Sequence, residues 1–410
     1  MGNDLQLNVV NFKKSAYITI EGKASNNCFY IIKSGNVSVT KEAVKNESEK
    51  LNPGDFFGVI SAMANHNHIE TVQAMTDVSV IAVNKDQFPL LIQKNSPIAM
   101  KIILSFSRKL RDLDKSITEL TLQSVNSVDE DVKNLYKVGE FYLKQNQFNH
   151  AFYAFYRFLQ FCPGDPFVPK AKEYLLQLKP KAKVAYIDAS EKNEFKRLYP
   201  DNTMICCEHE PGNELFIIQA GKIKITKMIE NKEVLLAVLK EGDIFGEMSL
   251  LENKPRSASG IAYGETSIMA VNKENFKNMI STQPQLVTKL ISLLAERTWV
   301  VYRQFTNLQI GSKIGRTYDI LLIQLEKNKI QIQPKVQHKF EFGPNELMNM
   351  AGLPVAEGKA IIQEIFANKK FQIEDGKITV TDIEEIKKQV DYYKKMEILE
   401  FKRKSSHQNF

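Results

Sequence analysis

A glycine, a glutamate and an arginine suited to binding a phosphate and a sugar lie close together in segment 245–259, FGEMSLLENKPRSAS. Gly246 has no Cβ, so the backbone N–H groups around it can approach an anion closely. Glu247 can accept a hydrogen bond from a sugar hydroxyl, and Arg256 can donate charge-assisted bonds to phosphate oxygens. The apolar residues between them fit one short helix with its N-terminus toward the anion. This spacing favours a site for a phosphate beside a ribose hydroxyl over an ordinary surface turn.

The order Phe-Gly-Glu, then Pro-Arg-Ser-Ala-Ser, resembles the phosphate-binding cassette of cyclic nucleotide-binding domains. The resemblance implies that the Ser257 hydroxyl and the Ala258 N–H make further phosphate contacts. The residues expected to contact a cyclic nucleotide are Gly246, Glu247, Met248, Ser249, Arg256, Ser257, Ala258 and Tyr302.

The identity of the base is less well determined by the residues. In the bacterial cAMP receptors a Thr-Ser pair contacts adenine, and here Val301-Tyr302 aligns with it. An aromatic ring, Trp299 or Tyr302, is then the candidate for stacking on a purine, with packing in a helix seam as the alternative for Trp299. We expect cAMP, with cGMP as the alternative because a hydroxyl at Ser257 can also reach a guanine edge.

The cassette belongs to an internal repeat. Residues 29–39 mirror residues 216–225, and residues 53–58 mirror residues 241–246. Each copy reads as short strands with turn glycines, followed by an apolar-striped helix at about 97–122 or 284–308. This pattern predicts two antiparallel β-rolls with capping helices, in domains spanning 1–122 and 183–308. The second copy adjoins the C-terminal part of the chain, so we expect its pocket to lie next to that part.

The first copy keeps the pattern of the fold and loses the chemistry of the cassette. Val59 stands at the position of the glutamate, His68 at the arginine and Glu70 at the alanine. A carboxylate there would repel a phosphate, and a histidine near pH 7 is a poor anchor for it. His66 and His68 also lack the further ligands that a metal site needs. We expect a degenerate domain that serves dimerisation or regulation.

The long helix of the first copy has an apolar stripe suited to pairing with another helix, with packing on its own roll as the alternative. A homodimer is expected from this stripe and from the family resemblance. The stripe consists of Ile98, Ile102, Ile103, Phe106, Leu110, Leu113 and Ile117.

A helical insert is expected between the copies, over 128–180. Its small, bulky and proline positions resemble one tetratricopeptide repeat, and they are Leu135, Gly139, Tyr142, Ala151, Phe155, Phe158 and Pro163. Phe158 departs from the pattern, which prefers a small residue there. One repeat cannot bury its own faces, so it must pack on a neighbouring domain or a protein partner. A plain helical hairpin acting as a spacer is the alternative.

Residues 310–382 read as helix, strand, two helices and a hairpin on the Asp375-Gly376 turn. Placed after a cyclic nucleotide-binding domain, this order resembles the winged helix-turn-helix of Crp/Fnr transcription regulators. A charged helix and tail follow over 383–410. The resemblance implies DNA as a partner.

The residues that would read DNA are poorly represented. The family's base-reading positions fall on Val355, Ala356 and Ala360, and residues 311–410 carry a net charge of only +3. The remaining candidates for DNA contact are Lys359, Gln363, Lys369 and Lys370.

The composition and the cysteine spacing limit the classes of protein to which this chain can belong. The 410 residues are 43% hydrophobic and 25% charged, with a net charge of +7. No membrane span or secretion signal is recognisable, and the four cysteines lack the spacing of zinc or disulfide frameworks, so a cytoplasmic location is expected. Cys206-Cys207 is expected on a strand with one thiol facing the core.

The sequence therefore predicts an α+β multidomain sensor of a cyclic purine nucleotide, without enzymatic activity or metal, that regulates transcription as Crp/Fnr proteins do. The alternative is a signalling scaffold whose insert and winged domain bind protein. No nucleophile–base arrangement or P-loop supports an enzyme.

Overall fold

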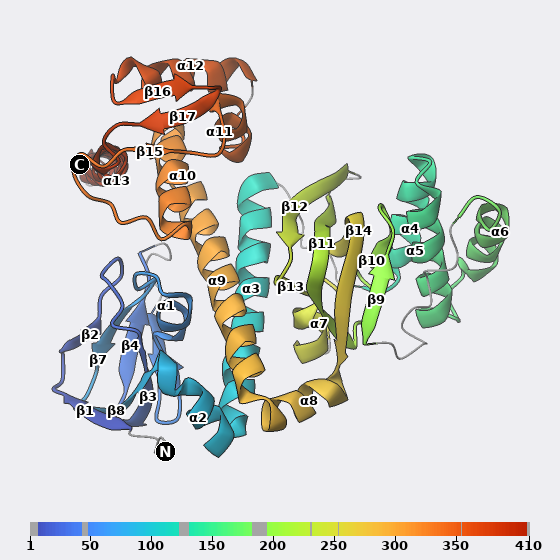
Figure 1. Cartoon of the computed structure of the whole chain (residues 1–410), viewed down its shortest axis with the longest axis horizontal. Helices are drawn as coiled ribbons and strands as arrows, with labels where there is room; N and C mark the ends of the chain where they lie inside the picture. Colours follow the sequence, from blue (N-terminus) through green and yellow to red (C-terminus); the bar gives the residue numbers. More distant parts are fainter. Residues whose placement is uncertain are drawn as a thin grey trace.

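The computed structural model describes residues 7–42, 48–122, 131–182, 195–229, 232–252, 254–353 and 355–407. Some of the predictions fall outside these ranges. They are the domain starts at 128 and 183, Pro354 in the turn between the two expected helices, and the last residues of the polar tail. Two β-rolls flank a central pair of long helices, a helical insert lies beyond the second roll, and a C-terminal module lies above the first (Figure 1).

The first roll is built from two four-stranded antiparallel sheets, ordered β1-β8-β3-β6 and β2-β7-β4-β5. Alternating side chains face its core; Val37 and Val39 of β4, for example, are buried while Thr40 is exposed. Its strands are β1 (Asn8–Phe12), β2 (Tyr17–Thr19), β3 (Cys28–Ser34), β4 (Val37–Thr40), β5 (Ser48–Leu51), β6 (Phe56–Phe57), β7 (Thr71–Ala74) and β8 (Val78–Asn84). Its helices are α1 (Val59–Ala64), the 3-10 turn η1 (Lys85–Gln87), α2 (Phe88–Lys94) and α3 (Ser96–Leu122).

The second roll repeats this plan with longer strands. Its six strands form one sheet, because β11 and β14 each run through both layers and pair along most of their length, with register shifts near Ala220. Its strands are β9 (Lys196–Tyr199), β10 (Met204–Cys206), β11 (Glu214–Ile229), β12 (Lys232–Lys240), β13 (Ile244–Phe245) and β14 (Ser259–Asn272). Its helices are α7 (Glu247–Glu252), α8 (Lys273–Thr282) and α9 (Pro284–Leu308).

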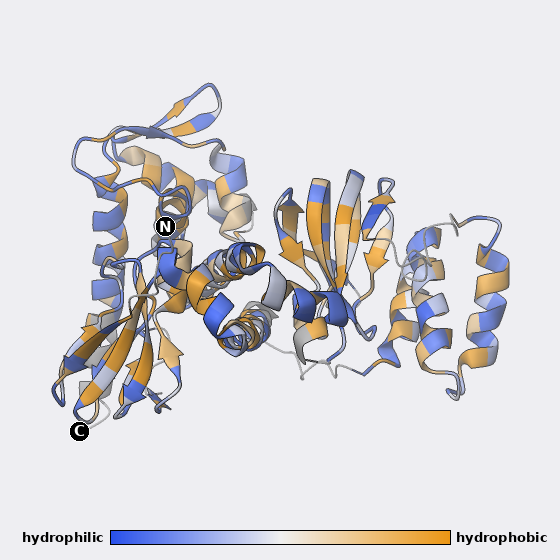
Figure 2. Ribbon diagram, turned by 60° about the horizontal axis from the view of Figure 1, so that its bottom comes forward, coloured by the Kyte–Doolittle hydropathy of each residue, from blue (hydrophilic) through white to orange (hydrophobic). Residues whose placement is uncertain are grey.

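The long helices α3 and α9 pack side by side and are seen nearly end-on between the rolls in Figure 2. The contacts are exchanged: α1 of the first roll packs on α9, and α7 of the second roll packs on α3. The apolar stripe of α3 therefore does pair with another helix, and that helix belongs to the same chain. Buried stripe residues such as Ile102 and Phe106 share one core with Leu290 and Leu294.

The insert consists of α4 (Asn134–Lys144), α5 (Phe148–Phe161) and α6 (Val168–Leu178), and it packs on the second roll. Its aromatic core includes the fully buried Phe155 and Phe158 and continues into Met204 and Cys207 of the roll. The expectation that one thiol of Cys206-Cys207 faces the core is confirmed for Cys206, which lies on β10 and packs inside the roll. Cys207, just after the strand, is buried as well, under the insert.

The C-terminal module has the sheet order β15-β17-β16 and a turn at Asp375-Gly376 with positive φ at both residues. The strand predicted over 339–343 is only partly regular. Its regular pairing with β17 ends at Lys339, but Phe340 still donates its N–H to Ile378, and Phe342 accepts the N–H of Ile378. Gly343 then turns the chain into α11, where Glu346 accepts its N–H. The module comprises α10 (Lys313–Lys327), β15 (His338–Lys339), α11 (Pro344–Met350), α12 (Val355–Ala367), β16 (Phe371–Glu374), β17 (Lys377–Val380) and α13 (Glu384–His407).

Candidate functional site

Gly246 forms the turn from β13 into α7 in the second roll. Its φ of +75° lies in the left-handed region, where a side chain is strained. A Cβ at this position would also collide with Nη1 of Arg256. The glycine is therefore required both by the turn and by the close approach of the arginine.

Arg256 is buried against this turn, with 5% of its surface exposed. Its Nη1 donates to the carbonyl oxygen of Gly246 at 2.8 Å, and its guanidinium lies 5.0 Å from the centre of the Phe216 ring. Its Nε lies 3.8 Å from Oε1 of Glu210 and has no hydrogen bond in the described part of the chain. A desolvated guanidinium with spare donors is suited to an anion such as phosphate.

Glu247 begins α7 and is 1% exposed. One carboxylate oxygen accepts from Nη1 of Arg297 on α9 at 3.0 Å. The other oxygen is buried and has no hydrogen-bond partner among the residues that the structure describes. Burial lowers the pKa of Arg297, but Glu247 and Asp114 outweigh it and keep the guanidinium charged. The unpaired oxygen is an acceptor available to a ligand hydroxyl.

The structure brings together seven of the eight expected ligand residues. Met248 and Ser249 are buried in α7, and the Ser249 hydroxyl donates to Gly246. Ser257 and Ala258 are half-buried in the loop that follows Arg256. These residues surround one short turn and its helix.

Tyr302 is the exception. Its hydroxyl donates to Glu21 of the first roll at 2.9 Å, so the residue lies away from the second cassette. The exchanged packing is the reason, since α9 belongs to the second roll and turns this face toward the first. Trp299 likewise stacks on His66 of the first roll, with ring centres 3.6 Å apart.

Glu210 is a site residue that sequence reasoning missed. It is 5% exposed and lies between Arg256 and Arg157 of α5, whose Nε is 3.5 Å from Oε2. Tyr153 of α5 also donates to it, at 3.4 Å. Burial raises the pKa of Glu210, against the opposing effect of the two arginines. It lies at a bend just before Pro211 and belongs to no motif, so no sequence signal marks it.

In the first roll, Glu70 fills the corresponding turn. Gly58 has the same φ of +75° as Gly246, and its N–H donates to Oε1 of Glu70 at 3.1 Å. Burial raises the pKa of Glu70, but Lys109, Lys41 and the Gly58 N–H outweigh it and hold the pKa below its usual value. The carboxylate is therefore ionised and occupies the place where a phosphate would meet the turn. His68 is buried, and burial lowers its pKa, so it stays neutral.

Three of the four residues expected to contact DNA are exposed: Lys359 and Gln363 on α12, and Lys369 after it. Lys370 is different, because its Nζ binds Asp382 and Glu385 at 2.8 Å each. Hydrogen bonds to these two carboxylates raise its pKa. This lysine links the start of the hairpin to Asp382 and to α13, and its contact with DNA stays a prediction.

Two segments of the chain match the family described as "Cyclic nucleotide-binding domain", over residues 9–95 and 196–283. The chain carries two cyclic nucleotide-binding domains. The first is the roll whose cassette turn Glu70 occupies, and the second is the roll with Glu247 and Arg256.

Several of the proteins similar to this chain are regulators of the Crp type. The cyclic AMP receptor protein of Thermus thermophilus is 35% identical over 103 residues, which are 25% of this chain and 48% of that protein. A CRP-like cAMP-activated global transcriptional regulator of Mycobacterium tuberculosis is 22% identical over 189 residues, which are 46% of this chain and 84% of that protein. The solved structure of the Thermus thermophilus catabolite activator protein matches at 23% identity and a TM-score of 0.28, covering 51% of this chain and 95% of that one. The sequence match spans about half the length of the Thermus receptor.

Two further features of the described ranges bear on function. None of their helices has the length and apolar character needed to cross a membrane. No group of three or more His, Cys, Asp or Glu side chains in them is arranged to hold a metal ion.

Proposed function

We propose that the second domain binds a cyclic purine nucleotide, preferentially cAMP and with cGMP as the alternative. The observation that carries this proposal is the pair of buried, incompletely bonded groups at the turn into α7, the guanidinium of Arg256 and the free oxygen of Glu247. They present a cation and an acceptor, as a phosphate and a ribose hydroxyl require. The cAMP-linked relatives support the same ligand.

Binding would exchange partners at both groups. The phosphate would replace Glu210 and the Gly246 carbonyl oxygen beside Arg256, while a ribose hydroxyl would donate to Glu247. Because Glu247 also holds Arg297 of α9, the ligand would change a contact on the helix that leads to the C-terminal module. Arg303, six residues further along α9, binds Asp319 and Glu326 of α10 at 3.1 and 3.0 Å.

The proposed output is transcription regulation of the Crp/Fnr type, in the cytoplasm, with the C-terminal module acting as a winged helix-turn-helix. Ligand would shift the population of module orientations, which changes DNA affinity only if one orientation binds the ligand better. A homodimer is part of this proposal. Since α3 and α9 already pair within the chain, its interface would have to lie elsewhere than on the α3 stripe.

The ligand assignment is tested by calorimetry with cAMP and cGMP on the full chain. Arg256→Ala should weaken binding about tenfold or more, because a charge-assisted bond is worth about 1.5–3 kcal/mol. His68→Ala, at the matching position of the first domain, is the control and should leave affinity within about twofold. Unchanged affinity in the Arg256 variant would sink the assignment.

A signalling scaffold is the second candidate function. It is favoured by the apolar residues at the family's base-reading positions, Val355, Ala356 and Ala360, and by the exposed apolar residues Phe167 and Leu176 of the insert, at 54% and 75%. DNA binding with and without cAMP over a salt series separates the two functions. Nucleotide-dependent binding that weakens steeply with salt supports the regulator, and its absence supports the scaffold.

A further inference from the structure

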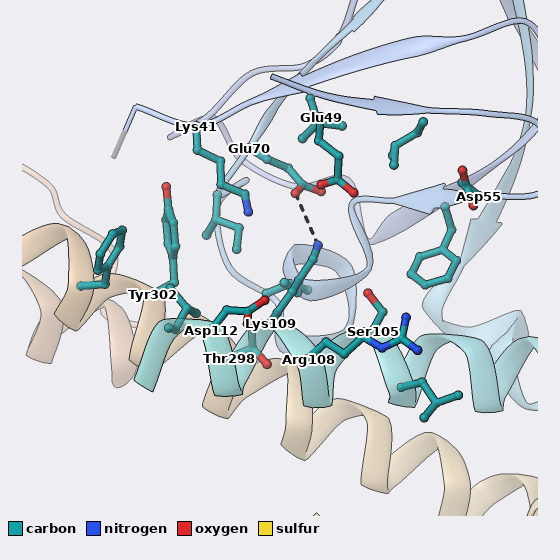
Figure 3. A pocket seen from close by; sticks show the side chains of 18 of the residues that line it. Lys41, Glu49, Asp55, Glu70, Ser105, Arg108, Lys109, Asp112, Thr298 and Tyr302 are labelled. Atoms are coloured by element: carbon teal, nitrogen blue, oxygen red, sulfur yellow. Dashed lines mark ion pairs between the residues drawn. The ribbon is translucent and has the colours of Figure 1, made fainter. Parts of the chain in front are cut away.

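A cavity of about 870 Å³ lies in the first domain, between its roll and both long helices (Figure 3). The roll contributes Lys41, Glu49 and Glu70, and α3 contributes its face from 101 to 116. The third wall comes from α9 of the second domain, through Thr298, Tyr302 and Phe305. A volume of this size accommodates a drug-sized molecule, and here both halves of the chain would contact it.

The cavity is not built for a cyclic phosphate. Glu70 already accepts the N–H of Gly58 at the cassette turn and lies 4.0 Å from Nζ of Lys109. A phosphate entering that turn would have to displace a buried carboxylate or lie beside it, and like charges at such distances repel strongly. A ligand of this cavity must therefore bind away from the turn.

Three cations at the cavity have no bonded partner in the described part of the chain. Lys109 is paired with Glu70, and Lys101 with Asp55 at 3.0 Å. Lys41, Lys50 and Arg108 line the same space and form neither a hydrogen bond nor a salt bridge there, and of these three only Lys41 is not exposed.

Lys41 is the partly buried one of these three cations. Burial lowers its pKa, Lys109 lowers it further, and the carboxylates of Glu70 and Glu49 offset this only in part. Its Nζ projects from the roll toward the cavity and lies 6.0 Å from the ring centre of Tyr302. An ammonium that is partly removed from water and has three unused donors is stabilised by an anion.

The remaining wall combines an apolar part with the polar side chains of Ser105, Asp112, Ser116 and Thr298. The apolar part is the one that matters for the body of a ligand. It would cover the body of a ligand whose charged group meets Lys41. The apolar lining consists of Val39, Leu51, Phe56, Ile60, Ile69, Leu104, Leu113, Tyr302 and Phe305.

We propose that this cavity is a second effector site, which binds a small organic anion with an apolar body, of the class of aromatic carboxylates and sulfonates. The anionic group pairs with Lys41, and the apolar body packs on Tyr302, Phe305 and the α3 wall. Tyr302 directly precedes Arg303, which binds Asp319 and Glu326 of α10. The ligand thus contacts α9 one residue away from its connection to the C-terminal module.

The test uses two fluorescent probes with the same rings, 8-anilinonaphthalene-1-sulfonate and the uncharged N-phenyl-1-naphthylamine. Lys41→Gln should weaken sulfonate binding to the full chain about tenfold and change binding of the neutral amine less than twofold. Lys41→Arg should restore sulfonate binding. Lys50→Gln, an exposed lysine at the same cavity, is the matched control and should change neither.

Leu104→Trp, which fills the cavity, should abolish binding of both probes, with thermal unfolding as the check on folding. Sulfonate binding that survives either Lys41→Gln or Leu104→Trp overturns the proposal. In Arg256→Ala protein, displacement of the sulfonate by cAMP would overturn the exclusion of cyclic phosphate. Lys41→Gln should leave cAMP affinity at the second domain unchanged, so the proposals for the two sites can be contradicted independently.

Discussion

The cassette arginine of the second domain is held by an internal carboxylate in this structure. Glu210 faces Arg256 on one side and Arg157 on the other, and all three are nearly excluded from solvent. Burial raises the pKa of Glu210 because few polar groups replace its lost hydration. A bound phosphate would need the same guanidinium, so Glu210 acts as its competitor.

Glu210→Gln should therefore strengthen cyclic nucleotide binding about three- to tenfold, by removing the competing charge. The wild-type protein should bind more tightly as pH falls through the raised pKa of Glu210, because protonation neutralises the competitor, and the variant should lose this dependence. Calorimetry at several pH values measures both. Glu214→Gln, which breaks the ion pair with Arg197 elsewhere in the domain, is the control. Equal or weaker binding in the Glu210 variant would show that Glu210 supports the site.

The sequence predicted the residues of the cassette segment in this site, but not the residues that reach the site from other elements. Gly246, Glu247 and Arg256 lie in one short segment, so their spacing carries the chemistry. Glu210 and Arg297 reach the same turn from a loop and from α9, and only tertiary packing places them there. The first domain was correctly expected to have a carboxylate at its turn, but the bond from Gly58 to Glu70 required coordinates.

At the scale of elements, the exchange of contacts between the rolls is the main feature that the sequence did not predict. The helical periodicity located α3 and α9, and the stripe on α3 indicated a partner helix. A stripe defines an apolar face but not which helix covers it, so the partner had to come from the structure. That same exchange explains why Tyr302 lies at the first domain.

Within the insert, the crossing of α4 and α5 depends on a small residue at Gly139. A Cβ at this position would lie 2.7 Å from the ring of Phe155, which is buried and cannot move away easily. Gly139→Ala should lower the free energy of unfolding by about 1–3 kcal/mol, as overpacked cores do. Gly164→Ala is the matched control, since a Cβ there meets nothing within 4 Å. Denaturant unfolding compares them, and equal midpoints would contradict a tight crossing.

At the scale of the whole molecule, the C-terminal module contacts the first domain. Its place in the sequence had instead suggested a position next to the pocket of the second domain. Nζ of Lys329, just after α10, donates to the carbonyl oxygen of Ala64 at 2.5 Å and lies 2.6 Å from Nε2 of His66. It also pairs with Glu296 of α9 at 3.2 Å. Burial raises the pKa of Glu296, but the bond from His66 and the charge of Lys329 outweigh it and hold the pKa low. The first domain, α9 and the module thus meet at one polar cluster.

Lys329→Gln should loosen this connection and let the module depart from the first domain more often. The lysine is 40% exposed, so its ion pair contributes at most about 1 kcal/mol, which corresponds to roughly a fivefold shift in the population of docked modules. Small-angle scattering should show a larger radius of gyration, and amide exchange in α1 should quicken near Ala64, whose carbonyl loses its donor. Lys327→Gln, at the exposed end of the same helix, is the control and should change neither. If docking of the module controls DNA binding, ligand in either domain should also change the DNA affinity of the Lys329 variant less. An unchanged radius of gyration and unchanged amide exchange would instead mean that α9 and α10 alone hold the module in place.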